Sequence, residues 1–175
     1  MGDDIDIRRS VAADESALAH LYPDAFPDED LLPLVRALLR DEASLLSLVA
    51  VKDRAVVGHV LFTQGNIDPA GERAALLGPL AVATRVQRRG IGGALIRAGL
   101  RELAPAGVRR VLVLGDPAYY GRFGFSVDHA VEPPCPIPQE WREAWRSIEL
   151  TGGPGGAQGR LVLPEHWMRP ALWQP

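Results

Sequence analysis

A short glycine-rich segment holds the residues of this chain most able to do chemistry. The segment from Gln87 to Gly92, with the sequence QRRGIG, lies between an apolar stretch, Leu76–Val82, and an amphipathic pattern that continues to Ala104. Glycines just before a helix let the backbone approach an anion closely, and the free N–H groups and positive dipole end of that helix then point at it. The two arginines add mobile positive charge. The segment therefore predicts a site for a phosphorylated ligand.

Two well-known phosphate loops fit this segment poorly. The P-loop pattern GxxxxGK[ST] is absent, since the only lysine of the chain is Lys52. The dinucleotide pattern GxGxxG finds its first two glycines in Gly90 and Gly92, and Asp116 follows at about the distance of a ribose-binding acid, but Leu95 occupies the third glycine position. A nucleotide-linked oxidoreductase is thus a weak alternative.

A third pattern, [QR]xxGxG after a strand and before a helix, resembles the acetyl-coenzyme A loop of the GNAT acyltransferase superfamily. Gln87, Gly90 and Gly92 fall on it in register. Residues 114–125, LGDPAYYGRFGF, are similar to a GNAT subgroup in which a strand ends in Leu-Gly-Asp-Pro and Tyr-Tyr-x-x-Phe-Gly-Phe follows. The resemblance covers roughly residues 55–127 and hardly reaches the C-terminal third.

The resemblance implies an α/β (α+β) fold with a mixed, splayed central sheet flanked by helices. It also implies an N-acyltransferase that moves an acetyl group from acetyl-CoA to a primary amine by direct attack on the thioester. The partners would be acyl-CoA and an amine acceptor, with no metal. A non-catalytic acyl-CoA-binding regulatory module remains a second alternative.

Gly78-Pro79 lies inside an expected strand, where a proline cannot donate to the ladder and so indicates a bulge or a parting from the neighbouring strand. In GNAT proteins the pantetheine arm of the cofactor lies in such a gap; an edge bulge without a ligand is the simpler explanation. The cofactor contacts that the resemblance implies are Leu80, Ala81, Val82, Gln87, Arg88, Arg89, Gly90, Ile91, Gly92 and Gly93. Arg97 and Arg101 are typical of a solvated helix face.

Tyr120 is the residue that the resemblance marks as the acid that protonates the departing coenzyme A thiolate. A tyrosine packed in the core is the alternative, and Tyr119 is its neighbour on the same short helix, expected over residues 117–122. Asp116 before Pro117 is typical of a helix N-cap, and we favour that role over a catalytic base.

The general base is not evident, because the expected splayed strand contains Leu77, Gly78, Pro79 and Leu80 and no carboxylate. His59 has a suitable ordinary pKa, although a lone histidine between apolar strand residues is more typical of a structural group. Asp28, Glu29 and Asp30 near the second helix, or a water relay, are further candidates.

Composition favours one domain over residues 1–175, with a core at about 5–127 and a divergent segment at 128–175. The chain is 47% hydrophobic, and its single cysteine, Cys135, excludes an internal disulfide. A net charge of −3 argues against a general nucleic-acid binder. The N-terminus lacks an apolar signal region and no run is long enough to span a membrane, so we expect a cytoplasmic protein, with a homodimer possible.

Hydrophobic periodicity predicts the elements that position these residues. Strands are expected at 5–8, 46–52, 55–63, 74–82 and 110–114, and helices at 14–22, from 30 onward and from the glycine loop to 104. Residues 74–115 should therefore form a βαβ unit. Trp141 and Trp145 are expected on one helix face, and all four tryptophans are interpreted as core cover in preference to an acceptor pocket or a dimer contact. Residues 133–138 read as a rigid connector and 151–156 as a flexible loop.

Overall fold

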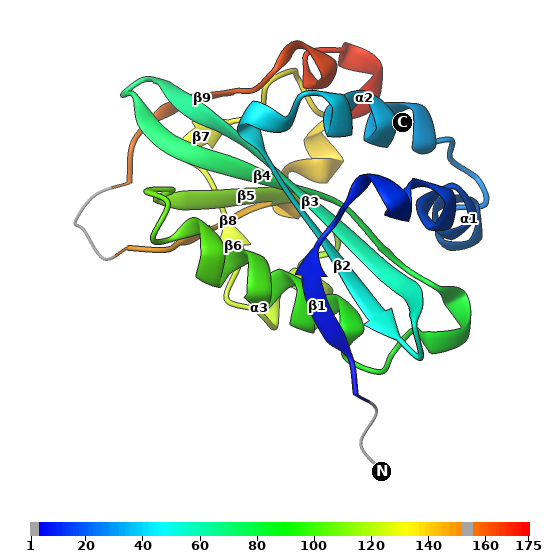
Figure 1. Ribbon diagram of the computed structural model, residues 1–175. Helices are drawn as coiled ribbons and strands as arrows, with labels where there is room; N and C mark the ends of the chain where they lie inside the picture. Colours follow the sequence, from blue (N-terminus) through cyan, green and yellow to red (C-terminus); the bar gives the residue numbers. More distant parts are fainter. Residues whose placement is uncertain (1–3, 152–155) are drawn as a thin grey trace. The chain divides into compact units, whose positions relative to one another are not determined.

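The structure, a computed structural model, describes residues 4–151 and 156–175 (Figure 1). Its strands are β1 (Asp6–Arg9), β2 (Leu45–Lys52), β3 (Ala55–Pro69), β4 (Glu72–Val82), β5 (Arg110–Leu114), β6 (Ser126–Val127), β7 (Val131–Glu132), β8 (Trp145–Glu149) and β9 (Gly159–Val162). The α-helices are α1 (Glu15–Ala25), α2 (Leu32–Arg40), α3 (Ile91–Leu103) and α4 (Pro117–Gly121). Short 3₁₀ helices lie at Ala12–Asp14, Glu42–Ser44, Thr84–Val86, Gln139–Ala144, Glu165–Trp167 and Pro170–Trp173.

The strands form one mixed sheet with the hydrogen-bonded order β1-β2-β3-β4-β5-β8-β6, and β9 pairs with both β3 and β7. The β4–β5 and β7–β9 pairs are parallel, whereas β1–β2, β5–β8, β6–β8 and β3–β9 are antiparallel. The expected α/β class with a mixed sheet flanked by helices is confirmed.

The described chain divides into two compact units. The first takes its residues from Met1–Phe62 and Gly78–Gly99, and the second from Thr63–Leu77 and Leu100–Pro175. The expectation of a single domain stays a prediction.

In the first unit, the expected amphipathic patterns bury their apolar faces. Leu34, Val35 and Leu38 of α2 are buried, in keeping with their i, i+1, i+4 spacing on one helix face. Helix α3 packs closely on β3 through a glycine: a Cβ at Gly99 would lie 2.1 Å from Cε2 of Phe62. Any larger residue at position 99 would therefore push the helix away from the strand.

In the second unit, β4 and β5 pair in parallel, with Ala74 opposite Arg110 and Leu76 opposite Leu112. Because α3 connects these strands, the expected βαβ unit is confirmed. The recorded pairs end at Leu76, although β4 continues to Val82. This is the outcome expected from Gly78-Pro79, since the pairing stops before the residue that cannot donate.

Two expectations about the elements were wrong. Trp141 and Trp145 do not share a helix face, because the 3₁₀ helix ends at Ala144 and Trp145 begins β8. Strand β3 runs on to Pro69, where pairing with β9 extends it beyond residue 63. Helix α2 begins at Leu32, close to the expected start near residue 30. Most of the expected flexible loop at 151–156 lies outside the described residues.

Three of the tryptophans fill the core of the second unit. Trp145, Trp167 and Trp173 are buried, and each indole N–H donates a hydrogen bond. Trp145 donates to the carbonyl of Val131 at 2.6 Å, and Trp167 donates to Oγ1 of Thr63 at 3.0 Å. Trp173 donates to the carbonyl of Trp167 at 2.9 Å. Buried indoles with satisfied N–H groups are typical of structural aromatic residues. The interpretation as core cover is confirmed for these three.

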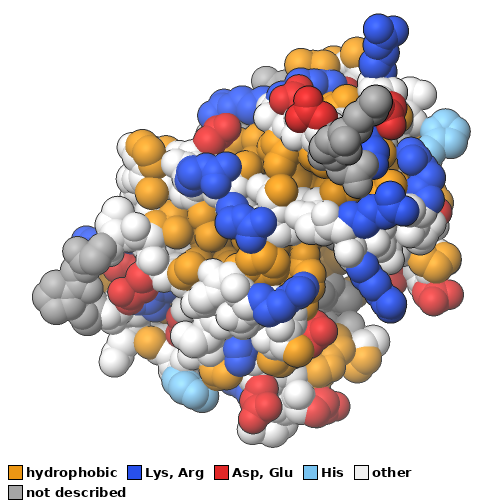
Figure 2. Space-filling view, turned by 90° about the horizontal axis from the view of Figure 1, so that it is seen from below, with side chains coloured by type: hydrophobic (Ala, Val, Ile, Leu, Met, Phe, Trp, Pro, Cys, Tyr) orange, Lys and Arg blue, Asp and Glu red, His pale blue; other side chains and the backbone are white. Residues whose placement is uncertain are grey.

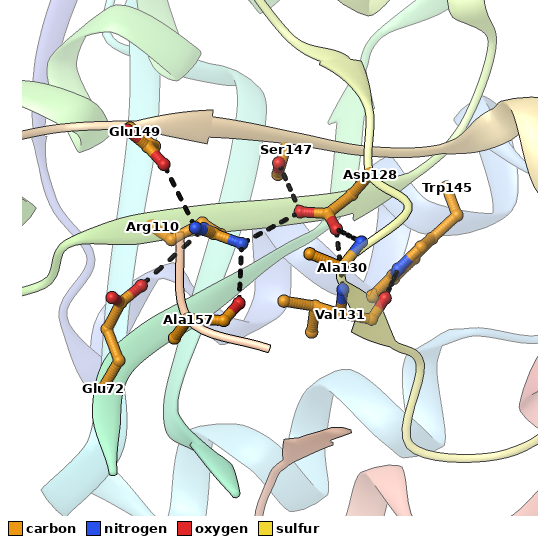
Figure 3. A network of polar contacts seen from close by, with 9 residues as sticks. All are labelled: Glu72, Arg110, Asp128, Ala130, Val131, Trp145, Ser147, Glu149 and Ala157. Atoms are coloured by element: carbon orange, nitrogen blue, oxygen red, sulfur yellow. Dashed lines mark hydrogen bonds and ion pairs between the residues drawn. The ribbon is translucent and has the colours of Figure 1, made fainter. Parts of the chain in front are cut away.

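A buried ion-pair network ties β4, β5 and β8 together (Figure 3). Arg110 is only 3% exposed, and its guanidinium lies 3.3 Å from Asp128, 3.1 Å from Glu149 and 3.7 Å from Glu72. Asp128 also accepts a hydrogen bond of 2.6 Å from the Ser147 hydroxyl. A buried cation is tolerated only with such partners. The sequence analysis, which predicted only a strand at 110–114, gave no sign of this network.

Candidate active site

The segment between β4 and α3 forms a backbone cradle. The Gln87 side chain donates a hydrogen bond of 3.0 Å to the carbonyl of Val82, which fixes the loop to the end of the strand. Arg88 and Gly90 have φ angles of 62° and 82°, so the chain turns through left-handed conformations just before the helix. Such a conformation favours glycine at position 90.

The helix start leaves donors for a ligand. The first helical hydrogen bond runs from the Ala94 N–H to the Gly90 carbonyl at 3.0 Å, so the preceding N–H groups are those that an α-helix leaves without internal partners. Gly90 is exposed, and no atom lies within 4 Å of the position that its Cβ would take. The cradle is therefore open to an approaching anion, and these residues fit the diphosphate of a coenzyme A molecule.

Charged side chains accompany the cradle. Arg85, Arg88 and Arg89 are all exposed on the loop. Figure 2 shows Lys and Arg side chains exposed on one face of the molecule, with hydrophobic side chains between them. A local excess of positive charge in a chain of net charge −3 favours a polyanionic ligand at this loop.

Removing the two arginines nearest the glycines tests their role. Arg88→Ala with Arg89→Ala should weaken acetyl-CoA binding by roughly 1.5–3 kcal/mol if each makes a charge-assisted contact. Arg101→Ala, on the exposed side of α3, is the matched control and should leave the affinity unchanged. Dissociation constants measured at two salt concentrations check this prediction. Equal losses of affinity in both proteins would mean that the arginines act only through long-range electrostatic attraction and make no direct contact with the ligand.

Asp24, which the sequence analysis missed, holds the start of the loop. One carboxylate oxygen accepts from the Thr84 N–H and the other from the Thr84 hydroxyl, both at 2.8 Å. These two hydrogen bonds lower the pKa of Asp24, and the one from the backbone N–H has the larger effect. The two residues are 60 positions apart, so no local pattern could have paired them.

The lowered pKa of Asp24 predicts a pH-dependent stabilisation. Its contribution is fully present above the unfolded pKa of about 3.9 and is lost as the pH falls through the lower folded value. Asp24→Asn should therefore lower Tm by roughly 2 °C at pH 7, and the difference from the wild type should shrink towards pH 3. Thermal unfolding of both proteins from pH 7 to pH 3 measures this. A difference that stays constant over the range would contradict it.

His59 lies inside the first unit and has no exposed surface. Its Nδ1 lies 2.7 Å from the Tyr22 hydroxyl and its Nε2 lies 2.8 Å from the Ser47 hydroxyl. Burial lowers the pKa of His59 to about 4, although the negative charge of Asp14 acts to raise it. The imidazole is therefore neutral at pH 7 and occupied on both nitrogens, which favours the structural interpretation; its role as a base stays a prediction.

Tyr120 is half-buried on α4, where its ring lies edge-on to Tyr119 and Phe125 with centroids 5.0 and 5.8 Å away. Burial, with smaller effects of Tyr119 and Asp116, raises the pKa of Tyr120 well above its ordinary value. The phenol thus keeps its proton at neutral pH, as an acid must. Within the described residues its hydroxyl forms no hydrogen bond, so the proton is not committed elsewhere.

The neighbours of Tyr120 have structural roles. Asp116 is the N-cap of α4, and its carboxylate accepts from the Ala118 N–H at 3.0 Å, as expected. The Tyr119 ring contacts Phe123, at 5.3 Å between centroids, and the Arg122 guanidinium, at 4.9 Å. Tyr119 is therefore a suitable control for Tyr120.

The remaining base candidates, Asp28, Glu29 and Asp30, are exposed between α1 and α2. Among the residues that the structure describes, no group of three or more His, Cys, Asp or Glu side chains could hold a metal ion. Likewise, no described helix combines the length and apolar character needed to cross a bilayer.

Comparison with known proteins gives one consistent family. The model of the acetyltransferase (GNAT) family matches residues 15–125. The uncharacterised N-acetyltransferase YjhQ of Escherichia coli K12 is 36% identical over 158 residues, which cover 85% of this chain and 86% of that protein. YhbS, a second N-acetyltransferase of that organism, is 35% identical over 124 residues, or 69% of this chain and 73% of YhbS.

Two solved structures are similar over nearly the whole chain. The GNAT-family N-acetyltransferase YhbS of Escherichia coli, solved in complex with CoA, has a TM-score of 0.86 at 28% identity and covers 97% of this chain and 94% of its own. A GNAT acetyltransferase of Brucella melitensis, solved in complex with acetyl-CoA, has a TM-score of 0.76 at 30% identity and covers 94% and 99%. All of the relatives and structures named here are described as acetyltransferases.

Proposed function

This chain belongs to the GNAT acetyltransferase family and transfers an acetyl group from acetyl-CoA, and we propose that the acceptor is a primary amine that attacks the thioester directly. The observation that carries this proposal is the cradle at the start of α3, with exposed arginines and a glycine in a left-handed conformation. It fits the diphosphate of the donor and leaves the acetyl thioester for reaction with a second substrate. A cytoplasmic location accompanies the proposal as a prediction.

The donor would be held by two sets of groups. The cradle, from Gln87 to Gly93, would bind the diphosphate through backbone N–H groups, while Arg88 and Arg89 would contribute charge. The backbone of Leu80, Ala81 and Val82, beyond the end of the β4–β5 pairing, would hydrogen-bond the pantetheine arm. A backbone N–H of this stretch would also polarise the thioester carbonyl.

In the proposed reaction, the amine lone pair attacks the thioester carbonyl carbon, a C–N bond forms and the C–S bond breaks. The Tyr120 hydroxyl gives its proton to the leaving thiolate, so that coenzyme A departs as a thiol. The amine loses a proton to solvent, through a water relay or one of the carboxylates at 28–30. Tyr120 recovers its proton from water.

A thiol-release assay tests the proposed function. The protein is incubated with acetyl-CoA and a panel of primary amines that includes a polyamine, an amino sugar and a lysine-containing peptide, and mass spectrometry identifies the acetylated product. We expect thiol release above the hydrolysis rate with at least one amine, and none with a tertiary amine control. Binding of acetyl-CoA without transfer to any primary amine would contradict the proposal.

A further inference from the structure

Gly115 lies directly against the ring of Tyr120. It follows the last residue of β5, and its N–H donates a hydrogen bond of 3.0 Å to the carbonyl of Ala144. Apart from its chain neighbours, the three heavy atoms nearest to a Cβ built on Gly115 all belong to the Tyr120 ring. Cε2 would be the closest, followed by Cδ2 at 2.9 Å and Cζ at 3.3 Å. The ring therefore occupies the space that a side chain at residue 115 would need.

The backbone at residue 115 does not itself require a glycine. Gly115 is not among the glycines with a left-handed φ, unlike Gly124, whose φ is 92°. An alanine could therefore adopt this backbone, and only the Tyr120 ring excludes its Cβ. Gly121 provides a contrast on α4: it also has no left-handed φ, and no atom lies within 4 Å of its Cβ position.

The backbone is held on both sides of this contact. The Tyr120 N–H donates to the Asp116 carbonyl at 3.0 Å, and the Tyr120 carbonyl accepts from the N–H groups of Phe123, at 3.0 Å, and Phe125, at 3.3 Å. Gly115 is held by its hydrogen bond to Ala144. Because the Tyr120 side chain is only half-buried, rotation of the ring is the easiest way to make room for a Cβ.

The size of the required movement follows from van der Waals distances. Non-bonded carbon atoms settle about 3.5–4.0 Å apart, so a Cβ at residue 115 would displace the nearer edge of the Tyr120 ring by about 1 Å. A misplacement of about 1 Å at a reacting group can lower a rate by up to about 10²-fold. The missing side chain at residue 115 thus bears directly on where the Tyr120 hydroxyl lies.

We propose that Gly115 is a positioning residue for acetyl transfer. Because it has no side chain, the Tyr120 ring can lie where its hydroxyl reaches the leaving thiolate. Gly115 itself gives no proton and needs no contact with either substrate, since it acts through the ring. This inference rests on the proposed role of Tyr120 as the acid, and it adds the residue that sets the position of that acid.

Steady-state kinetics with an identified acceptor test the proposal. Gly115→Ala should lower kcat by at least about tenfold, though by no more than Tyr120→Phe does, because the proton donor is moved and not removed. Acetyl-CoA affinity, measured by calorimetric titration, should stay within about twofold of the wild type. Gly121→Ala is the matched control and should change neither quantity. A wild-type kcat in Gly115→Ala, or an equal loss of kcat and acetyl-CoA affinity, would overturn the proposal.

A double-mutant cycle separates positioning from general damage. In the Tyr120→Phe protein the hydroxyl is gone, so adding Gly115→Ala should lower kcat by less than about twofold. A further loss as large as in the wild type would show that Gly115 acts on something other than the proton donor. Full turnover in Tyr120→Phe would refute the acid itself and this inference with it. A low kcat in Tyr120→Phe with a normal kcat in Gly115→Ala would refute this inference alone.

Thermal unfolding tests the contact without any acceptor. Gly115→Ala should lower Tm by a few degrees in the wild type, because the Cβ overlaps the ring. In a Tyr120→Ala protein the same change should leave Tm unchanged or raise it, since alanine restricts the unfolded chain more than glycine does. A single variant that fails to fold should likewise be rescued by Tyr120→Ala. An equal loss in both backgrounds would show that the Cβ meets another group, and would overturn the proposal.

Discussion

Gly90→Asp should weaken acetyl-CoA binding by about 10³-fold, because the new carboxylate would lie where the diphosphate approaches. One added pair of like charges about 4 Å apart costs about 4 kcal/mol at an effective dielectric constant of about 20. The space beyond Gly90 is open, so the side chain itself meets no atom within 4 Å. The loss should therefore come from charge and not from a steric clash with the protein.

The fold should survive this change. A non-glycine residue at the φ of 82° costs about 1–2 kcal/mol, although aspartate and asparagine tolerate the left-handed region better than most. A negative charge at the start of α3 also interacts favourably with the helix dipole. Stability and ligand affinity are thus expected to respond to the charge in opposite directions.

Gly90→Asn is the matched control, since asparagine has the shape of aspartate without its charge. It should lose about tenfold or less in affinity, and its Tm should be no higher than that of Gly90→Asp. Gly92 is a poorer position for this test because it is buried in the first turn of α3. Calorimetric titration with acetyl-CoA measures the affinity of both variants. Equal affinities would show that the diphosphate does not bind at this loop.

The sequence predicted the parts of the fold that depend on local spacing. The apolar run to Val82, the glycines at 90 and 92 and the helix to Leu103 are contiguous, so their order fixes a strand, a turn and a helix start. Asp116 followed by Pro117 predicted the N-cap of α4 for the same reason. Each of these signals arises within a few residues, where backbone preferences dominate.

Contacts between residues that are far apart in the sequence could not be predicted from it. Asp24 and Thr84 are 60 positions apart in the sequence, and Arg110 is 18 positions from Asp128 and 39 from Glu149. An exposed aspartate near the end of α1 looks like any solvated residue, and Arg110 was hidden in an apolar stretch. The donor loop was therefore predictable as a segment, whereas the group that anchors its first residue was not.

His59 shows a different limit. Its residue type suggested a general base, and the sequence pattern alone could not choose between that role and a structural one. The choice depends on burial and on the two hydroxyls at its ring nitrogens, which come from α1 and β2. Those partners occupy both ring nitrogens, which favours the structural interpretation, and the role of His59 as a base stays a prediction.

Tyr120→Phe should lower kcat by about 10²-fold if the phenol protonates the leaving thiolate. The change keeps the ring, and with it the edge-on contacts to Tyr119 and Phe125. Since the hydroxyl makes no hydrogen bond within the described residues, its loss leaves no buried partner unsatisfied. Acetyl-CoA affinity and Tm should therefore stay near the wild-type values.

Tyr119→Phe is the control on the same turn and should cost less than about threefold in kcat. Steady-state kinetics with an identified acceptor, together with thermal unfolding, separate a lost proton donor from a damaged fold. The raised pKa of Tyr120 adds a second readout, since kcat should not fall through phenol ionisation up to about pH 10. Full turnover in Tyr120→Phe, or a larger loss in Tyr119→Phe, would show that the proton comes from another group.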